Sequence, residues 1–167
     1  MIKRLRKRFI RIAMLAVTAV MVLLCLIVNI ANFVSVNSSL TNMLQVLGDN
    51  QGALPAPASP PDDHPGKRPD GQFTQETPYT TRYFVLRYTE DGTLVKADLD
   101  KIAAVTEDDT DTYLAIAQKH GTGMGFSSGY KYYVVDNGEG RFMAIFLDCH
   151  QEMRSMGTLA LLSVAPA

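Results

Sequence analysis

The sequence is poor in the residues that most often form cross-links. Only two of its 167 residues are cysteines. Cys25 lies inside a long apolar run and Cys149 follows a predicted strand near the C-terminus. A disulfide requires Cα atoms within about 7 Å, so we do not expect these two residues to pair. We expect Cys149 to be a small buried thiol; the alternative is an intermolecular bridge between two copies of it.

Patterns that carry catalysis or bind metals are also missing. His64, His120 and His150 do not have the spacing of metal ligands, and the triplet Asp62-Asp63-His64 has no second cluster to complete a site. The glycine-rich segment 121–126 follows a predicted helix, whereas a phosphate-binding loop opens one. No serine lies in a nucleophile-elbow context. We therefore expect no cofactor, no metal and no catalytic residue. This expectation disfavours one possible function of the chain, that of an anchored secreted enzyme.

Negative charge is absent from the first eleven residues, which carry six basic ones. The rest of the chain has 10 basic and 17 acidic residues, a net charge of −7. An acidic surface argues against nucleic acid as a partner, because phosphates are neutralised by Lys and Arg. The basic residues of the N-terminus (1–11) are Lys3, Arg4, Arg6, Lys7, Arg8 and Arg11.

Residues 12–34 form a run of 23 without a charged side chain. A helix of this length rises about 1.5 Å per residue and crosses a hydrocarbon core of about 30 Å, so we predict a transmembrane helix in contact with lipid. The basic cluster predicts a cytoplasmic N-terminus and an extracytoplasmic domain at the cell membrane. The alternative, a cleaved signal peptide, has a shorter apolar core of about 7–15 residues and a small-x-small cleavage site, which this run lacks.

The helix is predicted to continue over residues 35–47, where apolar residues recur at spacings of three and four. This face is expected to pack on the domain, on a partner helix, or on both, and Gly48 is the expected terminator. Residues 48–78 hold seven of the eight prolines and predict an exposed, mobile loop. The apolar residues on the predicted face are Phe33, Val36, Leu40, Met43, Leu44 and Leu47.

Residues 79–150 predict a small domain of the α+β class. Alternating and turn-forming residues indicate an antiparallel sheet in the order ββαββ, with the helix on one face. Thr106 is expected to cap that helix through its hydroxyl, with Tyr113, Ile116 and Ala117 facing inward. About 70 ordered residues give a marginal core, so packing by the preceding helix or homodimerisation should support it. The expected strands are 82–89, 94–98, 130–136 and 141–148; the helix is 107–120, and a glycine-rich connection covers 121–129.

The C-terminal residues 151–167 end in an apolar stretch from residue 157 onward. Eleven helical residues span only about half a bilayer. We expect this stretch to be the start of a second, truncated transmembrane helix; the alternative is a segment lying on the membrane surface.

The domain is rich in aromatic residues, most of which are expected in the core and in cross-strand pairs. Some tyrosines are instead candidates for a ligand groove or a dimer face. These candidates are Tyr83, Tyr130, Tyr132 and Tyr133.

Three segments carry a resemblance to a known family. They are residues 76–84 (ETPYTTRYF), 130–135 (YKYYVV) and 146–149 (FLDC), set between a basic start with one membrane helix and a second apolar run. The chain resembles the N-terminal sensor portion of membrane-bound bacterial two-component sensor histidine kinases. The resemblance implies a PAS- or Cache-like sensing domain flanked by two membrane helices in a homodimer. An unknown external signal would shift the helices and control a cytoplasmic kinase.

The kinase parts of that family are not found in this sequence. A phosphoacceptor helix and an ATP-binding domain are missing, so this chain alone is expected neither to bind ATP nor to phosphorylate itself. The segment from His150 to Arg154 is similar to a phosphoacceptor segment, but we predict it on the outer side, where nucleotide is absent. The alternative function is a stand-alone membrane-anchored binding or interaction module.

Overall fold

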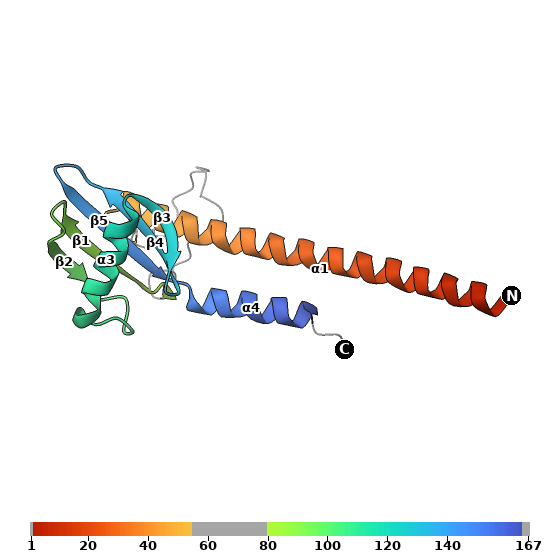
Figure 1. Cartoon of the computed structure of the whole chain (residues 1–167). Coiled ribbons are helices and arrows are strands. Elements are labelled where there is room, and N and C mark those ends of the chain that lie inside the picture. Colours follow the sequence, from red (N-terminus) through yellow and green to blue (C-terminus); the bar gives the residue numbers. More distant parts are fainter. Residues whose placement is uncertain (1, 55–79, 165–167) are drawn as a thin grey trace, which may run out of the picture. The chain divides into compact units, whose positions relative to one another are not determined.

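The computed structural model describes residues 2–54 and 80–164 (Figure 1). The chain divides into two compact units. One consists of residues 1–37 and 154–167, and the other of residues 38–153. The segment 55–79 lies outside the described residues, and with it most of the predicted proline-rich loop, the Asp62-Asp63-His64 triplet and Tyr79.

The first unit contains the long helix α1 (Ile2–Asp49) up to residue 37, and most of α4 (His150–Val164). Helix over residues 12–34 and 35–47 is confirmed. The large apolar side chains of the run are exposed, as a lipid-facing helix requires. Two polar side chains inside the run bond to the helix's own carbonyls: Thr18 Oγ1 donates to Met14 O at 2.9 Å and Asn29 Nδ2 donates to Cys25 O at 2.8 Å. Such bonds lower the cost of placing polar groups in lipid.

Within the described residues, the second unit has one antiparallel sheet of five strands in the order β2-β1-β5-β4-β3. A one-turn 3₁₀ helix, η1 (Glu107–Asp109), and the helix α3 (Thr110–His120) lie between β2 and β3 in the chain. The mixed helix-and-sheet class is confirmed, and so are four of the strands. The strands are β1 (Tyr83–Thr89), β2 (Leu94–Asp98), β3 (Gly123–Ser127), β4 (Tyr130–Asp136) and β5 (Arg141–Asp148).

The expected glycine-rich connection is in part a fifth strand, β3, so the predicted order ββαββ is wrong by one strand. Because glycine is depleted in strands, the glycines of this segment predicted a connection where the structure has a strand. Here Gly125 is opposite Tyr132, and a Cβ on Gly125 would lie 2.4 Å from the tyrosine hydroxyl oxygen. Ser128 and Gly129 both have positive φ and form the tight turn to β4. The glycine at 125 therefore makes room for an aromatic ring in a regular ladder.

The prediction that Gly48 ends the first helix is also wrong, because α1 continues to Asp49. The termination comes later, where the amide of Gln51 donates to Gly48 O and that of Gly52 donates to Leu47 O. This bonding pattern is a Schellman motif, with both residues at positive φ. Gly48 serves close packing instead, since a Cβ there would lie 2.7 Å from Cε1 of Tyr133.

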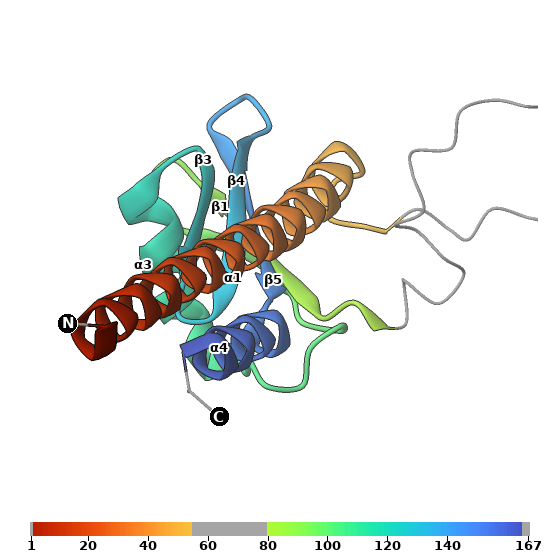
Figure 2. The same ribbon diagram turned by 90° about the vertical axis from the view of Figure 1, so that its right-hand side faces the viewer.

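Helices cover both faces of the sheet: α3 covers one, as predicted, and the end of α1 covers the other, which was one of the predicted alternatives for its apolar face. On the first face, α3 packs on a core with a central set of aromatic rings. On the other face lie the last turns of α1 (Figure 2). Leu40, Leu44 and Leu47 in these turns are buried. The core on the first face contains Leu114 and Ala117 from α3. Its residues from the sheet are Phe84, Leu86, Tyr88, Tyr130, Tyr132, Val134, Ala144 and Phe146.

The start of the α3 region is capped, in part through a carboxylate. Oδ2 of Asp109 accepts bonds from the Thr106 amide at 2.9 Å and from the Thr106 hydroxyl at 2.8 Å. The Thr106 side chain also accepts from the backbone of Asp109, as predicted, so the two residues form a capping box in which the Thr106 hydroxyl donates as well. Both bonds to the carboxylate lower the pKa of Asp109, and the bond from the Thr106 backbone amide has the larger effect.

Candidate functional site

The described chain has one helix that is long and apolar enough to cross a membrane, and it lies near the N-terminus. This is compatible with the predicted transmembrane helix; its orientation stays a prediction. Lys7, Arg8 and Arg11 are exposed on α1. The side chains of Lys3, Arg4 and Arg6 lie outside the described part.

The four candidate tyrosines do not form one surface. Tyr130 and Tyr132 are buried in the core beneath α3. Tyr83 is buried and Tyr133 half-buried, at positions that alternate to the opposite face of the sheet. A shared ligand groove made by all four is therefore not present in the described structure.

Lys131 is a functional candidate that the sequence did not reveal. It is 3% exposed, on the face of the sheet that α1 covers. Its Nζ donates a short hydrogen bond to the hydroxyl of Thr41 on α1 and lies 5.1 Å from the centre of the Phe126 ring. Burial lowers the pKa of Lys131, because an ammonium loses hydration there. The available signal was the position of Lys131 between Tyr130 and Tyr132, because strand alternation places Lys131 on the opposite face from these two tyrosines. Packing of residues 35–47 on the domain was one of the predicted alternatives, but no local pattern showed that this helix would cover Lys131.

A second group of contacts lies where β5 leads into α4. Oδ1 of Asp148 accepts a bond from the His150 amide at 3.0 Å and lies 2.8 Å from Nδ1 of the same residue. The His150 ring meets that of Tyr130 edge to face, with centroids 5.3 Å apart. His150 therefore joins the start of α4 to the sheet.

Cys149, between these two residues, is fully buried, and its Sγ donates to Leu147 O at 3.3 Å. Burial raises the pKa of the Cys149 thiol to about 11, so the group is neutral at pH 7. The prediction of a small buried thiol is confirmed.

The domain also has a wide hollow of about 670 Å³ beside the start of β1. Two cationic side chains, Arg82 and Lys101, and the carboxylate of Asp100 stand on its wall, and none of the candidate tyrosines lines it. Its lining is Thr81, Arg82, Asp100, Lys101, Ile102, Ala103 and Ala104.

Among the described residues, no three His, Cys, Asp or Glu side chains lie close enough together to hold a metal ion. The expected absence of metal and cofactor stays a prediction. Comparison with known protein families, curated proteins and solved structures found no match. The functional argument therefore rests on the geometry of this chain.

Proposed function

We propose that this chain is the extracytoplasmic signal-sensing region of a two-component sensor histidine kinase. In this proposal α1 anchors a homodimer in the membrane, and helix movement carries the signal inward. One observation carries the proposal. The helix that contains the apolar run, α1, also contains Leu40, Leu44 and Leu47, which are buried in the sheet-bearing unit.

This arrangement supports transmission, because a packed interface has a few discrete arrangements and does not deform continuously. A shift of α1 along the sheet must break the hydrogen bond between Lys131 and Thr41, and the buried leucines of α1 must pack at new positions. A ligand would favour one arrangement only by binding it more tightly than the other.

The finer identity of the domain belongs to the same proposal. A five-stranded antiparallel sheet with α3 on one face is compatible with a PAS- or Cache-like sensing domain. The abundance of exposed apolar residues on α1 is compatible with an anchor in lipid.

The proposal is tested by reading the gene beyond the codon for Ala167 and assaying the product. We expect the frame to continue through a membrane segment into a phosphoacceptor helix and an ATP-binding domain, with autophosphorylation by the whole protein. A stop codon with no kinase gene beside it contradicts the proposal. That outcome would instead support a stand-alone membrane-anchored interaction module.

A further inference from the structure

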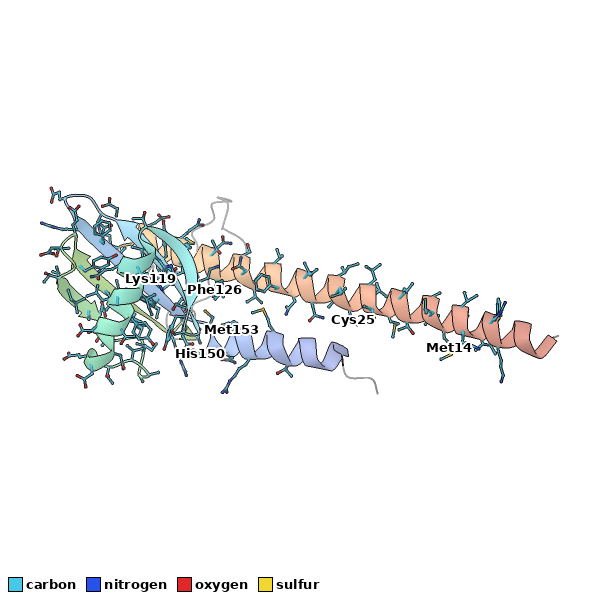
Figure 3. The ribbon with its side chains drawn as sticks, viewed as in Figure 1. Met14, Cys25, Lys119, Phe126, His150 and Met153 are labelled. Atoms are coloured by element: carbon cyan, nitrogen blue, oxygen red, sulfur yellow. The ribbon has the colours of Figure 1, made fainter. Side chains whose placement is uncertain are left out.

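The hairpin formed by β3 and β4, residues 123–136, contacts α1 and α4. These are the two helices that extend beyond the unit of residues 38–153. The hairpin touches the last turns of α1 with one part and the first residue of α4 with another. Figure 3 shows Phe126 on this hairpin and His150 at the start of α4. All the contacts described below lie within the unit of residues 38–153.

On the α1 side, the contacts come from alternate residues of β4. Lys131 bonds to Thr41, and the ring of Tyr133 lies so close to Gly48 that a Cβ there would be 2.7 Å from it. Gly48 and Thr41 are seven residues apart, about two helical turns, so both contacts fall on one side of α1.

On the α4 side, the contacts come from the turn of the hairpin. The amide of Cys149 donates to Gly129 O at 3.1 Å. The His150 ring lies over Gly129, where a Cβ would be 2.2 Å from Nε2. The ring of Tyr130 closes the group from the side.

The two sets of contacts are separated by only a few residues of one strand. Lys131 is adjacent to Tyr130, and β4 is held in register by β5 from Tyr130–Asp148 to Asp136–Phe142. Because β4 is paired along its whole length, we expect a displacement at Lys131 to carry its neighbour Tyr130 with it. We propose that the β3–β4 hairpin is the link through which movement of α1 changes the state of the first turn of α4. This inference rests on the proposed sensing function and specifies its route.

The competing route runs along β5, which leads directly into α4. The two routes differ in what a change at Thr41 should do. If the hairpin is the link, loss of the Lys131 contact is felt at α4; if β5 carries the shift alone, it is not. Coupling through packed side chains and hydrogen bonds is the physical basis in either case.

The test is amide hydrogen exchange on the whole chain in phospholipid nanodiscs, comparing wild type with Thr41→Val. Valine keeps the shape of threonine and removes the hydroxyl that accepts from Lys131. The probe is the amide of Met153, which donates to Cys149 O at 2.9 Å and reports on the first turn of α4. We expect its exchange to speed up by about threefold or more, a size expected of such coupling. The reverse experiment, His150→Ala, should speed exchange at residues 42–49 of α1.

The matched control is Gln118→Ala, which removes a 3.1 Å hydrogen bond from α3 to Gly92 O at the other end of the domain. It should change neither probe. An unchanged Met153 amide in Thr41→Val, with faster exchange only in α1, overturns the inference. Equal changes in Gln118→Ala overturn it too, because they would show general loosening. Since no kinase is needed for this measurement, its failure is distinct from failure of the proposed function.

Discussion

Lys131 shows how one side chain can define an interface at a cost in stability. An ammonium group in a covered position loses hydration, and the Thr41 hydroxyl and the Phe126 ring are among the groups that contact it there. A side chain retained at such a cost is more easily explained by a specific role than by stability. In this domain the role is to fix where α1 sits on the sheet.

Lys131→Met should therefore stabilise the domain at pH 7, by about 1 kcal/mol, because methionine fills the site without a desolvated charge. The pKa of Lys131 is lower in the folded than in the unfolded chain. The folded state therefore binds fewer protons, and the penalty is present below the lowered pKa and fades as pH rises toward 10.5. Urea unfolding at pH 7 and pH 10 measures the free energy of unfolding of both proteins. The difference between variant and wild type should be smaller at pH 10 than at pH 7. A variant less stable than wild type at pH 7 would contradict this account.

Asp109 gives the opposite pH dependence at the start of the α3 region. Its pKa lies below the usual 3.8 because the amide and hydroxyl of Thr106 bond to the carboxylate. The stabilisation is present above the usual value and is lost as pH falls through the lowered one. Asp109→Asn should weaken the capping at neutral pH. It should also make the helix content depend less on pH below about pH 4, because the titrating carboxylate is gone. Circular dichroism during acidification measures both effects. An acid transition identical to that of wild type would argue against this capping role.

At the scale of elements, the end of α1 depends on the glycine that closes it. Gly52 has φ +83°, and a Cβ there would lie 2.9 Å from Cγ2 of Val85. Both the left-handed backbone and the close approach to β1 therefore exclude a side chain. The Arg87 guanidinium donates to Gln51 O at 2.8 Å and holds the same turn to the sheet.

Gly52→Ala should destabilise the domain by more than Gly138→Ala does. Gly138 has a similar φ, +78°, but nothing within 4 Å of its Cβ position, so it isolates the backbone cost. We expect about 1 kcal/mol for Gly138→Ala, from strain in the left-handed region. The contact with Val85 should add about 1–3 kcal/mol for Gly52→Ala. Thermal unfolding of both variants measures the difference, and equal losses would show that the contact is relaxed at no cost.

The elements that sequence predicted well are those set by neighbouring residues. Alternation and the Asn137-Gly138 turn locate β4 and β5 to the residue. The apolar spacing predicts the buried Leu40, Leu44 and Leu47 of α1, but it wrongly includes Phe33, which is exposed. Strand β3 was missed because its glycines are explained only by Tyr132 on the next strand. The contacts of Lys131 with Thr41 and of His150 with Gly129 join residues far apart in the chain, so no local pattern predicts them.

At the scale of the whole molecule, charge and hydropathy divide the chain into regions suited to different environments. A basic N-terminus, an uncharged helical run and an acidic remainder are the pattern of an anchored protein. The sensing proposal depends on this topology, because a signal outside can reach the inside only if α1 spans the membrane.

The most direct test is labelling of Glu139→Cys by a membrane-impermeant maleimide on intact cells or spheroplasts that express the chain. The Glu139 side chain is 83% exposed, in the turn between β4 and β5, whereas native Cys149 is fully buried and Cys25 lies within the apolar run. The account predicts that position 139 is labelled before lysis and that the labelled chain stays in the membrane fraction at full length. Labelling only after lysis, or recovery of a shortened chain free of the membrane, would contradict it.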